Sequence, residues 1–141
     1  MTYVVDTSVF VRWWVEQVGW QHAQRVRDEF IAGDLVLLTP DFTRIELAEV
    51  LRKKALHDGV LTEDEYLGAV VALDVLGVEL VALDQDGVVR AAALAARRSL
   101  RMFDALSASL ALDRGHPLLT GDARCARALA GIVDVEVLEG I

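Results

Sequence analysis

Short apolar runs alternate along this chain with longer segments of helical periodicity, and this alternation constrains the fold more than any other feature. The runs cover residues 2–5, 35–38, 78–83, 116–119 and 135–138. Runs of this length suit strands that are buried on both faces. Parallel strands need crossover connections, which helices usually provide. The pattern predicts an α/β fold, with a central parallel sheet covered by helices on both faces.

The segments between the runs carry apolar residues at helical spacing. We expect helices from Thr7 towards Trp14 and over residues 20–31, 42–56, 62–76, 86–98, 104–114 and 123–130. Asp41 can cap the helix that begins at Phe42, and Thr62 with Glu65 has the spacing of a capping box. Pro40 and its neighbour Thr39 are expected to end the second strand, and Gly77 to end the fourth long helix.

Composition indicates one domain over residues 1–141. The 141 residues are 54% hydrophobic with a mean hydropathy of +0.36, which is ample material for a core, and no linker or repeat interrupts them. The net charge of −8 argues against a general nucleic-acid coat protein. It does not exclude an enzyme that acts on nucleic acid, because local basic groups remain. These are Arg52-Lys53-Lys54, Arg97-Arg98 with Arg101, and Arg124 with Arg127. Taken singly, each is typical of a solvated helix end.

The single cysteine, Cys125, cannot form an intrachain disulfide, and residues 1–6 contain neither a charged leader nor a long apolar signal. Acidic residues interrupt every apolar stretch before it reaches the length of a membrane span. We therefore expect a soluble, cytoplasmic protein without a membrane partner.

Four acidic residues lie beside the apolar runs and point to chemistry. Asp6 follows the first run, Asp122 follows the fourth, Asp104 begins an apolar helix, and Glu46 lies about one turn into the helix after the second run. The carboxyl ends of parallel strands share one edge of a sheet, where ligands usually bind. Carboxylates gathered there would repel one another unless a cation neutralises them, and oxygen ligands favour Mg²⁺ or Mn²⁺.

Each of these residues also has a simpler explanation. Asp6, Asp104 and Asp122 can be helix caps, and Glu46 can face solvent. The neighbouring hydroxyls of Thr7, Ser8 and Thr120 can orient metal ligands, although local turn and capping bonds explain them at least as well. The joint pattern of four carboxylates favours the metal site.

The residues that carry these carboxylates resemble the motifs of a known family. The segments are residues 4–9, residues 40–51, residues 103–111 and residues 117–122. Their order and spacing are similar to those of PIN-domain ribonucleases of the VapC toxin type, over nearly the whole chain. The one departure, Ser107 where an aromatic or aliphatic residue is usual, leaves all acidic positions intact.

The resemblance implies a three-layer α/β/α sandwich and a metal-dependent endoribonuclease. It assigns Asp6, Glu46, Asp104 and Asp122 as catalytic and metal-binding residues, with Mg²⁺ or Mn²⁺ as the cofactor. It further implies a toxin of a type II toxin–antitoxin pair, acting on transfer or ribosomal RNA. A cognate VapB-like antitoxin and a second copy of the chain, in a homodimer, are the expected protein partners. Trp13, Trp14 and Trp20 can serve either the core or such an interface, with Trp13 or Trp14 expected in the core.

Other classes fit less well. An aspartyl phosphatase would need a second acidic residue where Ser8 stands, and a receiver domain would need an early acidic pair. Serine or cysteine hydrolase chemistry lacks a nucleophile-elbow motif. His22, His57 and His116 do not have the spacing of metal ligands. The remaining alternative is a non-catalytic PIN-like scaffold or RNA-binding module.

Overall fold

A computed structural model describes residues 1–140 and contains a five-stranded sheet in the order β3-β2-β1-β4-β5. The strands are β1 (Thr2–Val5), β2 (Val36–Pro40), β3 (Glu79–Val81), β4 (Leu118–Thr120) and β5 (Val135–Val137). Every ladder of the sheet is parallel. The predicted parallel sheet is confirmed, and its strand order places the ends of β1 and β4 side by side.

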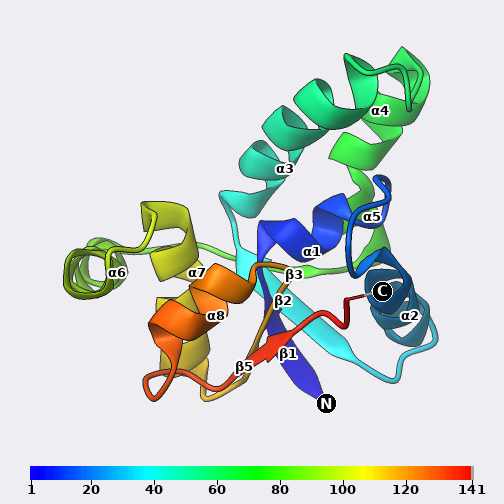
Figure 1. The fold of residues 1–141 in the computed structure, drawn as a ribbon. Coiled ribbons are helices and arrows are strands. Elements are labelled where there is room, and N and C mark those ends of the chain that lie inside the picture. The colour runs from blue at the N-terminus through cyan, green and yellow to red at the C-terminus, as the bar shows by residue number, and fades with distance from the viewer. Residues whose placement is uncertain (141) are drawn as a thin grey trace.

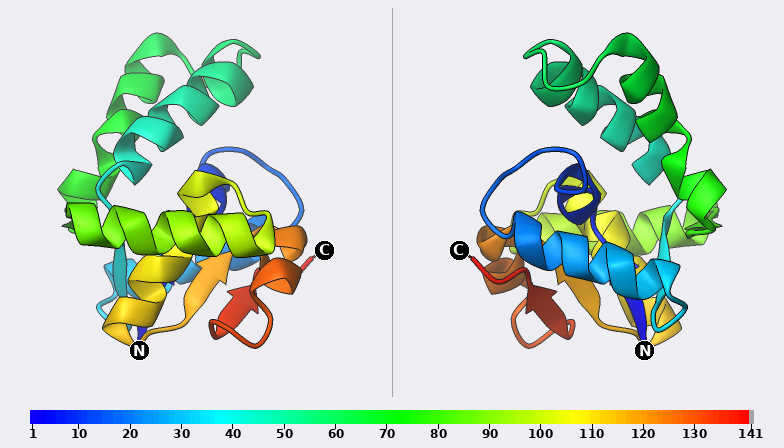
Figure 2. Two further views of the ribbon diagram at one scale, coloured as in Figure 1. Left: turned by 90° about the vertical axis from the view of Figure 1, so that its left-hand side faces the viewer. Right: turned by 90° about the vertical axis from the view of Figure 1, so that its right-hand side faces the viewer.

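Helices cover both faces of this sheet (Figure 1). One face carries α1 (Thr7–Val11), α2 (Trp20–Ile31) and α5 (Ala72–Leu76), and the other carries α6 (Gln85–Arg98), α7 (Met102–Arg114) and α8 (Ala123–Leu129). The remaining helices are α3 (Thr43–Leu51), a π-helical turn η1 (Arg52–Leu56) and α4 (Glu63–Val70). They project as an antiparallel arm beyond the carboxyl edge of the sheet (Figures 1 and 2). This is the α/β/α arrangement expected from the sequence.

Alternation along β1 explains the two cores. Tyr3 and Val5 belong to the cluster under α1 and α2, whereas Val4 belongs to the cluster under α7 and α8. Successive side chains of a strand point to opposite faces, so a strand that is covered twice must be apolar throughout. Val4 and Val5 are both fully buried. The strand therefore holds the residue that follows it, Asp6, firmly in place between the two layers.

Several predicted boundaries differ from the structure. β2 continues through Thr39 and ends at Pro40 instead of stopping before them, because both residues still pair with β3. The Thr39 hydroxyl also donates to the Val5 carbonyl oxygen. The expected helix over residues 42–56 passes into the π-helical turn at Arg52, and the one over residues 62–76 is broken at Val71. The helix that carries Asp104 begins earlier, at Met102.

The predicted caps have mixed outcomes. The Thr62 capping box is confirmed, because its hydroxyl accepts from Glu65 N and the Glu65 carboxylate accepts from Thr62 N. The cap assigned to Asp41 is wrong. Helix α3 begins without a side-chain cap bond among the described residues, and the Asp41 carboxylate pairs with the Arg44 guanidinium at 2.6 Å. The positive charge of Arg44, one turn away, attracts the Asp41 carboxylate more than the backbone amides at the start of α3 do.

Trp13 is the tryptophan that lies in the core. It is buried, donates its indole N–H to the Ala23 carbonyl oxygen and contacts Phe10 edge-to-face. Trp14 packs against the same cluster from its margin, and Trp20 is half-buried at the start of α2. Within residues 1–140, no helix combines the length and the apolar character that crossing a membrane requires.

Candidate active site

The carboxyl edge of the sheet opens into a pocket of about 480 Å³, directly beyond β1 and β4. Its lining includes the carboxylates of Asp6, Glu46 and Asp122 and the cationic side chains of Arg12, Lys54, Arg101 and Arg124. Asp104 faces an adjoining pocket, which shares Arg101, Asp122 and Arg124 with the first. The four acidic residues that the sequence analysis singled out thus all lie at this edge.

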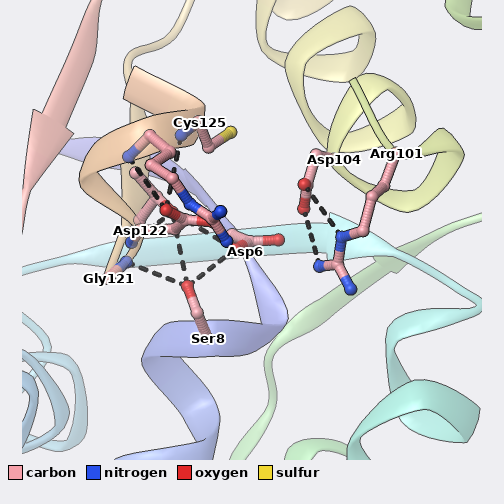
Figure 3. A network of polar contacts seen from close by, with 9 residues as sticks. Asp6, Ser8, Arg101, Asp104, Gly121, Asp122 and Cys125 are labelled. Atoms are coloured by element: carbon pink, nitrogen blue, oxygen red, sulfur yellow. Dashed lines mark hydrogen bonds and ion pairs between the residues drawn. The ribbon is translucent and has the colours of Figure 1, made fainter. Parts of the chain in front are cut away.

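Asp6 is held rigidly at the floor of the pocket. It is only 4% exposed, and its Oδ2 accepts hydrogen bonds from Ser8 Oγ at 2.6 Å and from Thr120 Oγ1 at 3.2 Å. Ser8 Oγ in turn accepts from the Gly121 amide at 2.9 Å, which ties α1 to the turn after β4 (Figure 3). Asp6 occupies the N-cap position of α1, yet no cap bond of its side chain is present in the described chain. Its carboxylate therefore lines the pocket and does not cap the helix.

The electrostatic setting of Asp6 is unfavourable for a lone anion. The pKa of Asp6 is raised to about 6, chiefly by burial. The charges of Asp104 and Glu46 also raise it, whereas the hydrogen bonds from Ser8 and Thr120 lower it. Among residues 1–140, Asp6 has no ion-pair partner. Arg12 and Arg101 act on Asp6 only through longer-range charge interactions. Both hydrogen bonds that Asp6 accepts within residues 1–140 go to Oδ2, which leaves Oδ1 open to a cation.

Asp104 is equally buried but is differently engaged. It lies in the first turn of α7 and is 5% exposed. Arg101 donates from Nε to Oδ2 and from Nη2 to Oδ1, each at 3.2 Å, so that both oxygens of the carboxylate are occupied (Figure 3). This hydrogen-bonded pairing with Asp104 raises the pKa of Arg101.

The other two carboxylates lie nearer the solvent. Glu46 lies on α3 and is half-buried, and its negative charge raises the pKa of Asp6. Asp122 caps α8, because its Oδ1 accepts from the amides of Arg124 at 2.9 Å and Cys125 at 3.4 Å. The capping explanation therefore holds for Asp122 and not for Asp6 or Asp104. Asp122 nevertheless lines both pockets.

The four side chains surround the pocket without converging on one point. Within residues 1–140, no group of three or more acidic, histidine or cysteine side chains is close enough to hold an ion as the side chains stand. Arg101, at the N-cap position of α7, holds the Asp104 carboxylate by two hydrogen bonds. Thr7 lines the pocket wall, whereas Ser8 and Thr120 bond directly to Asp6.

Arg12 is the pocket residue that the sequence interpretation missed. Its Nη1 donates to the Ser8 carbonyl oxygen at 2.5 Å and its Nε to the Val18 carbonyl oxygen at 2.8 Å. The guanidinium lies against Gly121, where an added Cβ would come within 2.6 Å of Nη1. A signal was present, because an arginine that follows Val9, Phe10 and Val11 directly is unusual on a buried helix.

An apolar groove of about 560 Å³ adjoins the site on its α3 side. Phe42 and Phe103 stack there with ring centroids 4.9 Å apart, and Ile45 is 72% exposed beside them. Glu46 borders both this groove and the main pocket. Cys125 belongs to the adjoining pocket that Asp104 faces. Its thiol is buried and burial raises its pKa to about 12, so it remains protonated and does not act as a nucleophile.

Comparisons with known proteins agree with this architecture. The model of the PIN domain matches residues 3–131. The chain therefore belongs to the PIN-domain family, a family of nucleases. No curated protein matches the sequence.

Solved structures of toxin–antitoxin proteins resemble it over nearly their full length. A Klebsiella pneumoniae toxin–antitoxin complex is 18% identical with a TM-score of 0.71, and covers 99% of both chains. Mycobacterium tuberculosis VapC20, a sarcin-ricin loop cleaving toxin, is 17% identical with a TM-score of 0.73, and covers 96% of this chain and 99% of its own. VapBC-5 of the same organism is 25% identical with a TM-score of 0.56, and covers 98% of both.

Proposed function

We propose that this protein is a Mg²⁺- or Mn²⁺-dependent endoribonuclease and the toxin of a type II toxin–antitoxin pair. One observation carries the proposal. Asp6 is a buried carboxylate that has no ion-pair partner among the described residues, at the floor of a pocket whose rim is cationic. A floor that attracts a divalent cation and a rim that attracts phosphate are the two requirements of a metal-dependent nuclease.

The residues present fit a hard divalent ion. All candidate ligands are carboxylate oxygens, which Mg²⁺ and Mn²⁺ prefer, and Asp6 is desolvated enough to favour a cation strongly. Asp6 and Asp104 would hold the ion, with help from Glu46 and Asp122. Ser8 and Thr120 would keep the Asp6 carboxylate in one orientation through the hydrogen bonds they already donate.

When bound, the ion would supply a water of lowered pKa and a charge that neutralises the phosphate. The protein contributes the geometry around it. Buried Asp6 and Asp104 exclude bulk water from one side of the pocket, and Glu46 and Asp122 stand at its more exposed edge, where each can accept a proton from an attacking water. Lys54, Arg101 and Arg124 line the opening and can pair with phosphate oxygens of a bound strand.

RNA is the substrate class that we propose, with transfer or ribosomal RNA as the specific targets. The family and the toxin relatives support it, VapC20 being one that cleaves the sarcin-ricin loop. The acidic net charge argues for a recognition site confined to the pocket rim, because the surface as a whole repels phosphate.

A cognate antitoxin, VapB-like in kind, is the proposed partner in the cytoplasm. Toxin–antitoxin complexes are among the similar structures, and the apolar groove around Phe42 and Phe103 offers contact area beside the site. We further propose a homodimer. Light scattering of the purified chain at micromolar concentration would give twice the monomer mass of 15.5 kDa, and a stable monomer would contradict this part of the proposal.

Cleavage of total cellular RNA by the purified protein tests the activity. The reactions should contain Mg²⁺ or Mn²⁺, with EDTA in parallel, and the fragment ends should be mapped. Asp6→Asn is the decisive variant, and Asp113→Asn is its matched control because Asp113 is an exposed carboxylate remote from the pocket. We expect discrete cuts that require both the metal and Asp6 and that survive in the control. Absence of cuts that depend on both the metal and Asp6 would refute the proposal, whether no fragments form or the same fragments persist in EDTA and in Asp6→Asn.

A non-catalytic PIN scaffold that binds RNA is the second candidate. The spacing of the carboxylates and the occupation of Asp104 by Arg101 favour it. The two functions separate in one experiment, since a scaffold retains RNA in a filter-binding assay but produces no fragments at any metal concentration.

A further inference from the structure

The Arg101–Asp104 contact joins an exposed cation to a buried anion. The Arg101 side chain is 70% exposed, whereas that of Asp104 is 7% exposed. Arg101 stands at the N-cap position of α7, where its extended backbone directs the guanidinium back over the first turn. Ser99, two residues earlier, adopts a left-handed conformation with φ 53° and is the C-cap of α6, so only a short loop separates the two helices. The contact is therefore built by the loop and needs no partner from elsewhere in the fold.

The fork of Arg101 covers the two oxygens that a metal would need. Nε and Nη2 each lie 3.2 Å from an oxygen of Asp104, and Figure 3 shows the guanidinium facing the open end of the carboxylate. A protein carboxylate binds a small divalent ion through the same lone pairs that accept from a guanidinium. The guanidinium and a divalent ion therefore compete for Asp104.

A divalent ion should win this competition. Both donor distances are at the long end for charge-assisted hydrogen bonds, and an exposed guanidinium retains most of its water, so that the pair is weak. A divalent ion carries twice the charge and approaches a carboxylate oxygen to about 2.1 Å. Asp6 supplies a second buried carboxylate, without an ion pair among the described residues. Its negative charge also favours the charged form of Arg101, but the guanidinium bonds to Asp104 alone, whereas an ion between the two carboxylates would be bound by both.

We propose that Arg101 is a displaceable counter-ion of Asp104, a positioning residue that occupies the ligand in the metal-free protein and lowers the affinity of the site for divalent cations. On displacement the guanidinium remains at the mouth of the main pocket, which it already lines beside Lys54 and Arg124. There it can pair with a phosphate oxygen of the substrate. Arg101 thus changes partner from Asp104 to RNA, and the inference rests on the proposed metal-dependent function.

Mn²⁺ affinity without RNA tests the competition. Free Mn²⁺ is measured by electron paramagnetic resonance during titration of the wild-type protein, Arg101→Ala, Arg101→Lys and Arg90→Ala. The last is a matched control, because Arg90 pairs with Asp113 at 2.8 Å at the other end of α7. We expect Arg101→Ala to lower the Kd roughly 3- to 10-fold, as the loss of a weak competitor predicts. Arg101→Lys should lie between, because lysine keeps the charge and loses the fork.

A nuclear magnetic resonance measurement reports displacement directly. The Arg101 Nε–H signal, assigned by its loss in Arg101→Ala, should shift when Mg²⁺ saturates the wild-type protein, while the Arg90 signal stays in place. Circular dichroism confirms that the variants are folded.

The outcomes distinguish the inference from the function on which it rests. Equal or weaker Mn²⁺ binding by Arg101→Ala, or an Arg101 signal that Mg²⁺ does not move, would overturn the counter-ion role and leave the metal site standing. Absence of Mn²⁺ binding in all four proteins would refute the metal-dependent function and the inference together. Binding by Arg101→Ala alone would show that the ion does not displace Arg101 from Asp104 in the wild-type protein, and would overturn the displaceable counter-ion.

Discussion

Replacing Asp6 by asparagine should stabilise the metal-free protein at neutral pH. The pKa of Asp6 rises from 3.8 to about 6 on folding, chiefly because the carboxylate is buried. One pKa unit corresponds to about 1.4 kcal/mol, so ionised Asp6 lowers the free energy of unfolding by about 3 kcal/mol above pH 6. Asparagine removes this charge but leaves an amide N–H₂ group in the pocket floor, at a cost of about 1 kcal/mol. The net gain expected at pH 7.5 is about 2 kcal/mol.

The sign follows from proton linkage. Between pH 4 and pH 6 the folded protein keeps a proton on Asp6 that the unfolded chain has lost, so the free energy of unfolding falls as the pH rises through this window. The advantage of Asp6→Asn should accordingly shrink by about 2 kcal/mol between pH 7.5 and pH 4. Other carboxylates titrate in both proteins and cancel in the difference.

Urea denaturation in EDTA, followed by tryptophan fluorescence, to which the buried Trp13 contributes, measures this difference. Asp113→Asn serves as the control, and its effect should stay within about 0.5 kcal/mol at both pH values because its carboxylate is exposed. Loss of stability in Asp6→Asn at pH 7.5, or a difference that does not change with pH, would refute the reasoning. Either result would mean that Asp6 is compensated in the fold and has a structural role.

Three further predictions test other parts of the structure. Asp104→Asn should abolish metal-dependent RNA cleavage and keep a cooperative urea transition, whereas unfolding would indicate a structural carboxylate. Gly121→Ala should lower the free energy of unfolding by about 1 kcal/mol, because the new Cβ would lie 2.6 Å from Arg12 Nη1 and the guanidinium must shift, which weakens its hydrogen bonds to the carbonyl oxygens of Ser8 and Val18; the double variant Arg12→Ala/Gly121→Ala should lose less than the sum of the single changes. Thr62→Ala should cost about 1 kcal/mol by removing the capping box and leave cleavage unchanged; reduced cleavage would show that the α4 arm acts on the site.

The architecture could be predicted because its signals are local. Val4 and Val5 are apolar on successive positions, which only a strand covered on both faces tolerates, and both are fully buried. The Thr62 capping box needs nothing beyond four consecutive residues. The break at Val71 and the π-helical turn at Arg52 could not be predicted in this way, since neither glycine nor proline marks them.

The positions of the acidic residues follow from the same topology. Asp6 and Asp122 come after neighbouring parallel strands, so their proximity depends only on the pairing of β1 with β4. Their protonation and bonding do not follow from topology. The carboxylate of Asp6 turns to two hydroxyls and that of Asp122 to helix amides, although both follow a strand and precede a helix. Burial decides between them, because the nearly inaccessible Asp6 lies between the two layers and Asp122 on the more open turn.

The cations of the pocket show where a linear sequence stops being informative. The position of the Arg12 guanidinium depends on Gly121, which lies 109 residues later in the chain. Any larger side chain at position 121 would take the space of this guanidinium. Arg101 pairs with Asp104, a carboxylate only one helical turn away. Arg52 and Glu49 have the same spacing, yet they form an exposed pair that is not part of the pocket floor. What separates the two pairs is the burial of Asp104 against the sheet, which only the assembled fold supplies. An arginine beside a carboxylate can therefore affect a metal site only where the fold buries that carboxylate. The Mn²⁺ titration measures how strongly Arg101 competes with the ion for Asp104.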